Sequence, residues 1–247
     1  LSLNLIRSFV TTIFRGLYFL PIANPAELHD NRISTDIFGV IPNVIEDEID
    51  EDRFQQSIES LLVNINSTIK SKNSLSKIIL FTSPTPSNGK SFVSREFSKT
   101  LAKMGHRVLL IDSDLKRGQQ SKHIKTNNPK LNETGFYKIT QENLEDLKVS
   151  ENFYFIPRIR ELRNTFSFLY SQQYLKQIEL FKSHFEYIVI DTPPILSVSD
   201  TSILMSMSDI VVGLIRHEQS KISEIKQMLN TSSQLGIEFD GLIYNDY

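Results

Sequence analysis

Apolar and polar positions follow two different periods along this chain. Uninterrupted apolar runs predict strands that are buried on both faces of a sheet. Apolar residues that recur at helical spacing between these runs predict amphipathic helices. The predicted strands are residues 37–41, 77–82, 107–112, 153–157, 186–191, 210–215 and 239–243, and the predicted helices are residues 54–69, 93–104, 166–184 and 220–235.

The order of these elements indicates the fold class. Strands that alternate with helices predict a mainly parallel central sheet with helices on both faces, so we expect an α/β fold. Residues 115–152 are polar and yield no clear elements. Their lysines have no interleaved aromatic side chains, which argues against a nucleic-acid partner.

The N-terminal stretch has a pattern of its own. Residues 1–20 have apolar side chains on one helical face and Arg7 and Arg15 on the other, which predicts an amphipathic helix and a poor membrane span. Such a helix either packs on its own domain or lies along a membrane surface. The chain starts without Met, and we expect a fragment in which residues 1–50 form this helix and a connector and residues 51–247 the main domain.

Composition narrows the possible functions. The chain has 247 residues, of which 40% are hydrophobic, so it can bury the core of one large domain. Its net charge of -2 provides no general attraction for nucleic acid. The chain has no cysteine, which excludes disulfides, zinc–thiolate sites and a thiol nucleophile, and fits a reducing cytoplasm.

The strand predicted at residues 77–82 leads into a loop that ends in Gly89-Lys90-Ser91, where a helix is predicted to begin. A phosphate-binding loop has this arrangement: backbone N–H groups surround the phosphates, a lysine reaches the β- and γ-phosphates, and a hydroxyl binds Mg²⁺. The helix N-terminus also favours anions. A Gly-Lys-Ser turn is common by chance, so other motifs must decide whether this loop binds nucleotide.

The first half of the loop is unusual. Pro84 stands where such loops have their first glycine, and Ser87 and Asn88 precede Gly89. Because proline holds its own φ negative, any residue with positive φ must lie later in the loop. A non-glycine residue in that conformation costs about 1 kcal/mol, which the loop can tolerate.

Carboxylates follow two of the predicted strands. Asp112 ends one strand, with Asp114 two residues later, and Asp191 ends another. Parallel sheets bind ligands at the carboxyl ends of their strands, so we expect these carboxylates around Mg²⁺ and a nucleotide. One aspartate after a strand is more often a turn residue, but two such strand ends after a Gly-Lys-Ser loop favour a site. Asp112 is our candidate for the base that accepts the proton of an incoming hydroxyl.

Two of these motifs carry a family resemblance. Asp112-Ser-Asp114 and Ile188-Val-Ile-Asp191-Thr-Pro-Pro194 resemble the second and third nucleotide motifs of bacterial tyrosine kinases, which are P-loop NTPases. These kinases form the cytoplasmic part of co-polymerases that control capsule and exopolysaccharide export. The resemblance runs from Pro25 to Asn245. It implies an ATP-dependent protein tyrosine autokinase that phosphorylates tyrosines in the C-terminal tail of a neighbouring subunit.

The resemblance also implies roles for individual residues. The catalytic residues would be Lys90, Asp112 and Asp114. The ligands of Mg²⁺ would be Ser91, Asp112, Asp114 and Asp191. ATP or ADP would contact Ser87, Asn88, Gly89, Lys90, Ser91 and Phe92, with Asn245 near the adenine. Tyr247 is the candidate phosphoacceptor.

The implied partners follow from the same family. The chain would assemble with itself, as a homo-oligomer that can form a ring, and act with the machinery of polysaccharide polymerisation and export. A cognate tyrosine phosphatase would reverse its phosphorylation. Membrane spans outside this chain would hold it at the cytoplasmic face of the bacterial inner membrane.

Several positions depart from the family pattern. Glu59 and Leu62 stand where family members have arginines that help to assemble the ring, and Lys116 replaces an arginine without its bidentate fork. An arginine-containing stretch, Arg158-Ile-Arg160-Glu-Leu-Arg163, follows Pro157 in place of a proline-rich segment. The tyrosine-rich tail is missing, and Tyr244, beside the last strand, is more consistent with a structural residue.

Two other functions stay open. A partitioning-type ATPase would use the nucleotide as a switch, but such ATPases have an additional lysine early in the loop, and residues 83–88 contain none. A catalytically weak scaffold would bind Mg-nucleotide without turnover and act in polysaccharide export through assembly alone. The acidic run at residues 46–52 is either a solvated helix start or a contact for Arg158, Arg160 and Arg163 of a neighbouring copy.

Overall fold

A computed structural model describes residues 21–42, 48–69, 76–115, 118–126, 131–160, 162 and 164–246, with residues 48–50 described as backbone. The helix expected in residues 1–20 and the candidate phosphoacceptor Tyr247 lie outside these ranges. Lys116, Arg163 and residues 46–47 of the acidic run lie outside them as well.

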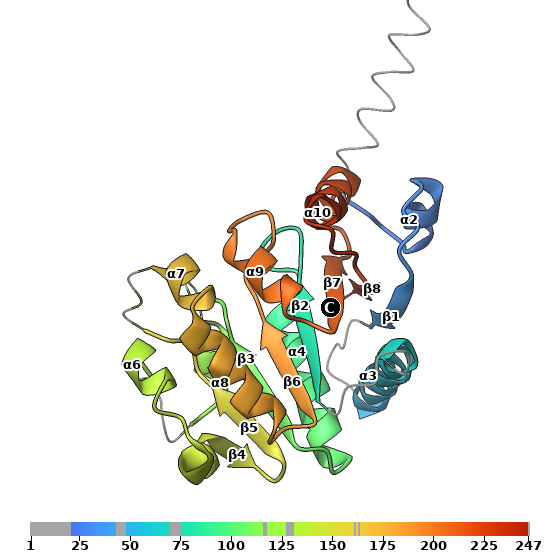
Figure 1. Cartoon of the computed structure of the whole chain (residues 1–247). Coiled ribbons are helices and arrows are strands. Elements are labelled where there is room, and N and C mark those ends of the chain that lie inside the picture. Colours follow the sequence, from blue (N-terminus) through green and yellow to red (C-terminus); the bar gives the residue numbers. More distant parts are fainter. Residues whose placement is uncertain are drawn as a thin grey trace, which may run out of the picture.

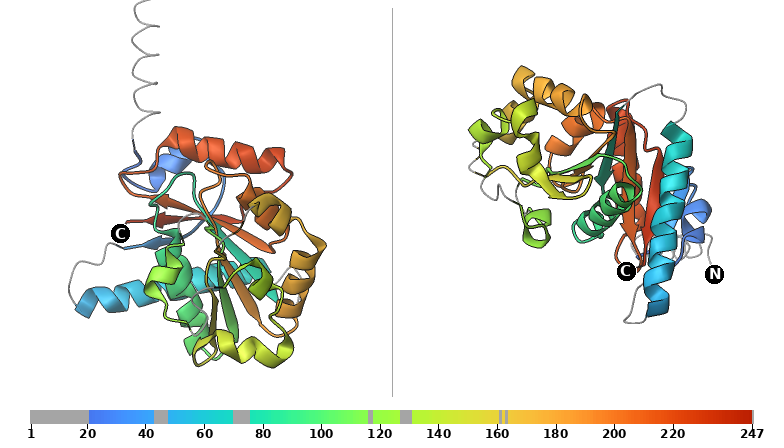
Figure 2. Two further views of the ribbon diagram at one scale, coloured as in Figure 1. Left: turned by 90° about the vertical axis from the view of Figure 1, so that its left-hand side faces the viewer. Right: turned by 90° about the horizontal axis from the view of Figure 1, so that it is seen from below.

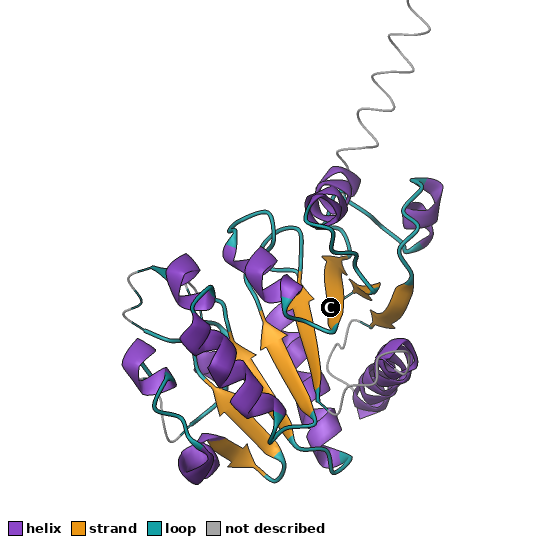
Figure 3. Ribbon diagram, in the orientation of Figure 1, coloured by secondary structure: helices purple, strands orange, loops and turns teal. Residues whose placement is uncertain are grey.

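The described chain forms one sheet of eight strands in the order β1-β8-β7-β2-β6-β3-β5-β4 (Figures 1 and 3). Neighbouring strands pair in parallel, except that β4 is antiparallel to β5 at one edge. The mainly parallel α/β sheet predicted from the sequence is therefore confirmed. The strands are β1 (Ile37–Ile41), β2 (Lys77–Thr82), β3 (Val108–Asp112), β4 (Lys148–Ser150), β5 (Phe153–Ile156), β6 (Tyr187–Asp191), β7 (Ile210–Arg216) and β8 (Gly241–Asn245).

Helices cover both faces of the sheet (Figure 2). One face packs against α3 and α4, where the rings of Phe81 and Phe97 meet edge to face with centroids 5.4 Å apart. The other face packs against α8, α9 and α10. The helices are α2 (Ala26–Asp30), α3 (Glu48–Ile69), α4 (Lys90–Lys103), α5 (Gln120–His123), α6 (Glu133–Phe136), α7 (Thr165–Leu169), α8 (Gln172–Lys182), α9 (Asp200–Ser206) and α10 (Ile222–Gln234), with the 3-10 helix η1 (Gln141–Leu147).

The strand order places the candidate motifs side by side. β6 lies directly between β2, which leads into the phosphate loop, and β3, which ends in Asp112. All three strands run in parallel and are almost entirely buried, as their continuous apolar sequences predict. Their carboxyl ends therefore meet at one edge of the sheet.

Two predicted elements differ from the structure, and one stretch without a prediction contains several elements. The helix predicted at residues 166–184 is two helices, because the Ser171 hydroxyl accepts the Tyr174 N–H (3.1 Å) and caps a new helix, α8. The last strand runs from Gly241 to Asn245, two residues later than predicted, so Asn245 lies in the strand and not after it. The polar stretch that gave no prediction contains α5, α6, η1 and β4.

The described part of the N-terminal segment belongs to the same sheet. β1 pairs with β8, and the backbone of Ile22 exchanges hydrogen bonds with Ser220 and Glu218. The boundary expected after residue 50 falls inside α3. Within the described ranges, no helix has both the length and the apolar character required to span a bilayer.

Candidate functional site

The phosphate loop lies between β2 and α4, as predicted. Its Lys90 is the first residue of α4, and its side chain is buried, with Nζ 3.1 Å from Ser83 Oγ. The lysine therefore folds back over the loop that precedes it. An ammonium in this position, at the N-terminal end of a helix, concentrates positive charge where phosphates would bind.

The backbone of the loop turns at the two positions where φ is positive. These are Ser87, with φ 66°, and Gly89, with φ 87°. Both follow Pro84, which confirms the prediction that the positive-φ residues lie in the second half of the loop. The strain at Ser87, about 1 kcal/mol, must be offset by contacts elsewhere.

Side chains from β7, from the turn that follows it and from β8 supply those contacts. Gln219 Nε2 donates to the Pro86 carbonyl (3.0 Å), Arg216 donates to the Ser87 carbonyl (3.0 Å), and Asn245 Nδ2 donates to the Asn88 carbonyl (3.0 Å). We call these three side chains the carbonyl clamp. Because three consecutive carbonyls are held outward, the clamp stabilises the loop in the conformation that leaves N–H groups for an anion.

The Asn88 side chain also braces the loop. Its Nδ2 donates to the Thr85 carbonyl (2.6 Å), and its Oδ1 accepts the Ser220 hydroxyl (2.6 Å). Asn88 and Asn245 are both fully buried. Because their side-chain amides form hydrogen bonds within the protein, Asn88 can contact a nucleotide only through its backbone.

Close packing of Gly89 against Asn245 yields a first testable prediction. A Cβ at Gly89 would overlap Asn245 Nδ2, and the φ of 87° is unfavourable for any L side chain. We therefore expect Gly89→Ala to lower the free energy of unfolding by about 2 kcal/mol and to weaken nucleotide binding. Chemical denaturation and nucleotide titration measure the two effects.

Gly105 provides the matched control. It has φ 94°, but no described atom lies within 4 Å of the position that a Cβ would take there. Gly105→Ala should thus cost only the backbone strain, about 1 kcal/mol, with nucleotide affinity at the phosphate loop unchanged. Equal losses of stability and of affinity in both variants would show that the contact with Asn245 has no importance.

The aspartates at the two strand ends lie next to each other. Asp112 of β3 and Asp191 of β6 are register partners, and Asp191 is also the partner of Phe81 in β2. Both carboxylates are buried, with 1% and 0% of their surface exposed. This confirms that the two strand ends meet beside the phosphate loop.

The hydrogen bonds of the two carboxylates come from residues that the sequence did not single out. Asp112 Oδ2 accepts from the backbone N–H and the hydroxyl of Ser121 (3.3 and 3.2 Å). Asp191 Oδ2 accepts from Gln120 Nε2 (3.0 Å), which also contacts the Ser91 carbonyl (2.6 Å). Both donors are in α5, within the polar stretch that had no periodic pattern by which to find them.

Burial and mutual repulsion change the acidity of this pair. The pKa of Asp112 is raised to about 8, mainly by burial and to a smaller extent by the negative charge of Asp191. Burial raises the pKa of Asp191 to about 6, although Lys90, the Ser91 hydroxyl and Gln120 oppose this shift. At neutral pH the site therefore holds a proton that a bound cation would displace.

The raised pKa of Asp112 has a consequence for stability. Between about pH 4 and pH 8 the folded chain keeps a proton that the unfolded chain has lost, so the free energy of unfolding falls as pH rises through this window. Asp112→Asn removes the effect. We expect this variant to exceed the parent in stability by about 1 kcal/mol or more at pH 8, and by less at pH 5, in denaturant titrations.

An exposed aspartate serves as the control for this pH dependence. Asp146→Asn, in η1, should change stability little at either pH. A gain for Asp112→Asn of equal size at pH 5 and pH 8 would contradict the assignment of a raised pKa.

Oxygen atoms at the site fit a hard cation. Asp112 Oδ1, Asp191 Oδ1 and Gln120 Oε1 are buried, and each lacks a hydrogen-bond partner among the described residues. The described residues contain no group of three or more His, Asp or Glu side chains arranged as a complete metal cage. Mg²⁺ requires no such cage, because it keeps several waters and binds one or two carboxylates together with phosphate oxygens.

A pocket of about 260 Å³ opens above these groups. Its wall includes Lys90, Ser91 and Asp114, together with Arg216 of the carbonyl clamp. Asp112 and Asp191 do not line the pocket and lie buried beneath it. The other lining residues are Pro86, Ser87, Gly89, Phe92, Gln119 and Pro194.

Some residues that depart from the family pattern now have a structural account. Leu62 is 4% exposed and belongs to the core beneath α3, so its side chain is not available for contact with a second subunit. Glu59 is exposed on the same helix and accepts a hydrogen bond from Gln55 (3.0 Å). Tyr244 is 3% exposed and its hydroxyl contacts His217 Nδ1 (2.7 Å), which agrees with a structural role.

Comparison with known proteins supports the resemblance. A family model described as an AAA domain matches residues 76–240. The putative tyrosine-protein kinase EpsB of Ralstonia solanacearum is 29% identical over 169 residues, which cover 68% of this chain and 22% of EpsB. The chain thus spans about a quarter or less of the length of this relative.

Solved structures share the fold over most of the chain. The kinase domain of the Escherichia coli tyrosine kinase ETK superposes with a TM-score of 0.76 at 19% identity, covering 91% of this chain and 94% of that domain. A ParA family ATPase from Chlorobium tepidum superposes with a TM-score of 0.58 at 14% identity, covering 69% of this chain and 73% of the ATPase. At these identities the likeness shows the fold alone.

The family match extends from the residue before β2 to the residue before β8. It therefore contains the phosphate loop, both strand-end aspartates and the polar stretch that carries Gln120 and Ser121. The chain belongs to the AAA domain family, and in sequence and fold it resembles the bacterial tyrosine kinases.

Proposed function

We propose that the chain is an ATP-dependent protein tyrosine kinase that acts on other copies of itself. The observation that carries the proposal is the pocket shared by Lys90, Ser91 and Asp114, with the Asp112–Asp191 pair directly beneath it. The lysine would supply positive charge to the phosphates, and the hydroxyl and carboxylates would supply oxygen ligands for the metal. Phosphoryl transfer needs charge neutralisation and positioning more than covalent help from the protein.

In the proposed reaction the phenol oxygen of a tyrosine attacks the γ-phosphorus of ATP, the bond from phosphorus to the β–γ bridging oxygen breaks, and ADP leaves. Asp112 accepts the phenol proton, and Lys90 stabilises the charge on the transferred group. Mg²⁺ would be held by Ser91 and by Asp112, Asp114 and Asp191, directly or through water, and would neutralise phosphate charge. Asn245 lies behind the loop and would hold it while an adenine binds nearby.

The shape of the pocket adds a condition to this mechanism. Asp114 lines the pocket, whereas Asp112 is buried beneath it. For Asp112 to receive the proton, the substrate must displace the contacts above it or the proton must pass through a water. A nucleotide bound in the pocket would therefore lie closer to the carboxylate of Asp114 than to that of Asp112.

Two alternative functions share this pocket. A partitioning-type ATPase has the same fold, as the ParA comparison shows, but residues 83–88 lack the additional loop lysine of that class. A scaffold would bind Mg-nucleotide without hydrolysing it or transferring its phosphate. The names of the curated relatives favour the kinase, since EpsB of Ralstonia is named a putative tyrosine-protein kinase.

Incubation of the chain with γ-labelled ATP and Mg²⁺, followed by mapping of phosphotyrosine, separates the three functions. Label on tyrosine, transferred between copies at a rate that rises with protein concentration, supports the kinase. Phosphate release without label supports the switch. Tight binding with neither product supports the scaffold.

We further propose the cellular setting of a capsule or exopolysaccharide co-polymerase. The chain would assemble as a homo-oligomer at the cytoplasmic face of the inner membrane, act with the polymerisation and export machinery, and be reset by a cognate tyrosine phosphatase. Tyr247 would accept phosphate if the chain ends in the tail of the whole protein. Mass spectrometry of the labelled chain identifies the acceptor.

A further inference from the structure

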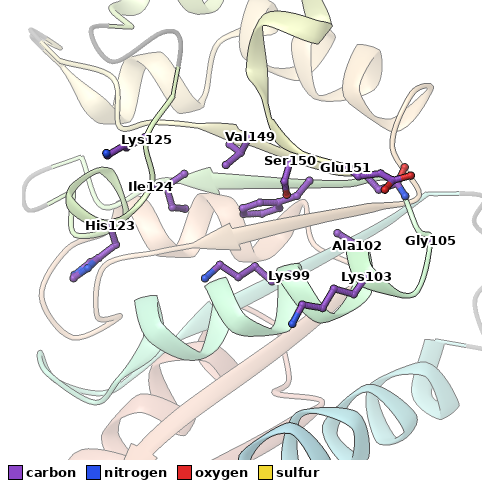
Figure 4. A pocket seen from close by; sticks show the side chains of 12 residues that line it. Lys99, Ala102, Lys103, Gly105, His123, Ile124, Lys125, Val149, Ser150 and Glu151 are labelled. Atoms are coloured by element: carbon purple, nitrogen blue, oxygen red, sulfur yellow. The ribbon is translucent and has the colours of Figure 1, made fainter. Parts of the chain in front are cut away.

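A second cavity lies away from the phosphate loop. It has a volume of about 700 Å³ and is enclosed by the C-terminal half of α4, residues 123–125 and the β4–β5 turn (Figure 4). α4 begins at Lys90 in the phosphate loop and ends at Lys103 beside this cavity. A helix of this length spans roughly 20 Å, so one nucleotide cannot occupy both places.

Basic side chains line this cavity. Lys99 and Lys103 extend along α4 toward the side on which His123 and Lys125 lie, and Glu151 lies on the opposite side (Figure 4). Three lysines thus face one carboxylate, in a chain whose net charge is -2. The cavity therefore concentrates positive charge that the composition as a whole does not have.

The partners of these groups leave the excess charge unbalanced. Lys99 Nζ contacts Glu96 (3.0 Å), but Glu96 also pairs with Arg95 (3.1 Å), so that one carboxylate serves two cations. In the described part of the chain, no hydrogen bond or ion pair engages the Lys103 or Lys125 ammonium or the His123 ring. An anion in the cavity would find these groups available.

Part of the cavity lining is apolar. It includes Val149, which is partly exposed, and the edges of Ile124 and Phe153, which are 7% and 2% exposed. A concave surface that is partly apolar and has a few charged groups around it is typical of small-molecule sites in this range of volume, whereas protein partners cover wide and flatter surfaces. Lysine ammonium groups bind phosphate as point charges.

We propose that this cavity is a second ligand site, which binds a nucleoside diphosphate at the end of α4 opposite to the phosphate loop. The lysines would hold the diphosphate, and the apolar surface would contact the base. The inference does not depend on the kinase activity, because it requires no chemistry. It predicts that the chain binds two nucleotides, of which only one contacts Lys90.

Equilibrium dialysis of the full chain against labelled ADP with Mg²⁺, at concentrations up to about 1 mM, tests the proposal by stoichiometry. We expect two ADP per chain for the parent, and one each for Lys90→Met and for the triple variant Lys99→Gln/Lys103→Gln/Lys125→Gln. The triple variant should weaken the second site at least tenfold and leave the first unchanged. The control variant Lys138→Gln/Lys176→Gln/Lys182→Gln removes the same charge elsewhere and should keep both sites.

The outcomes distinguish the two sites. If the parent binds one ADP per chain, Lys90→Met binds none and the triple variant still binds one, the second site does not exist and the proposed function is unaffected. Two ADP in Lys90→Met would contradict the phosphate-loop assignment instead. Binding of hexaglutamate is measured in the same way. If the parent binds hexaglutamate and only one ADP, and the triple variant binds no hexaglutamate, the cavity is a site for an acidic peptide and the nucleotide proposal is wrong.

Discussion

Lys90→Met is expected to lower tyrosine phosphorylation roughly 10³-fold or more. Methionine keeps the length and the apolar stem of lysine but has no charge. The buried ammonium lies 3.1 Å from Ser83 Oγ, at the wall of the phosphate pocket, and no other lysine of the described ranges lines that pocket. The rate of label transfer from γ-labelled ATP measures the loss.

The control for this variant is an exposed lysine away from both cavities. Lys138→Met should phosphorylate at the parental rate, because its side chain lies on the surface outside the site. Lys90→Arg is a stricter test, since it keeps the charge in a bulkier, planar group, and should recover only a small part of the activity. Persistent label in Lys90→Met would show that the site has been misassigned.

Asp112→Asn is expected to lower the rate of transfer by roughly 10² to 10⁴-fold, with ATP binding almost unchanged. The amide retains the shape of the side chain and can still accept the hydrogen bonds from Ser121, so the fold is preserved. What it loses is the ability to take a proton. Single-turnover rates at saturating ATP, compared with ATP affinity, separate the two contributions.

Asp114→Asn provides the comparison. Because Asp114 lines the pocket and Asp112 does not, Asp114→Asn should weaken binding of Mg-ATP as well as transfer. If Asp112→Asn retains the parental single-turnover rate while Asp114→Asn loses it, Asp114 is the base and Asp112 is a structural carboxylate.

The two effects of Asp112→Asn have opposite signs. The same substitution that removes the base should stabilise the chain above neutral pH, because burial and Asp191 raise the pKa of this carboxyl to about 8. A residue that costs stability and yet is required for the reaction is typical of a site in which function opposes stability. A variant that lost both activity and stability would indicate a structural role.

The sheet could be predicted because its strands are buried on both faces. Continuous apolar sequences such as residues 77–82 and 186–191 leave little ambiguity, and the alternation with helices fixes the parallel arrangement. The second and third motifs were located for the same reason, since each aspartate stands at the end of such a strand. The break at Ser171 was missed because the apolar spacing continues through it and only the cap changes the helix.

The supporting residues of the site could not be predicted. Gln120 and Ser121 lie in a four-residue helix within a polar stretch, and no periodicity marks their contact with Asp191 and Asp112. Arg216 and Gln219 are far from the loop in sequence and bind its carbonyls only because β7 lies next to β2. Contacts of this kind depend on the three-dimensional arrangement of the strands and leave no local pattern.

The position of a bound nucleotide decides whether these residues form the site, and a crystal structure of the chain with a non-hydrolysable ATP analogue and Mg²⁺ would determine it. We expect Lys90 Nζ to leave Ser83 and to contact β- and γ-phosphate oxygens, with the metal beside Ser91 and with Asp112, Asp114 and Asp191 around it directly or through one water. A nucleotide bound elsewhere, or a metal with none of these three carboxylates in its first two coordination layers, would contradict it.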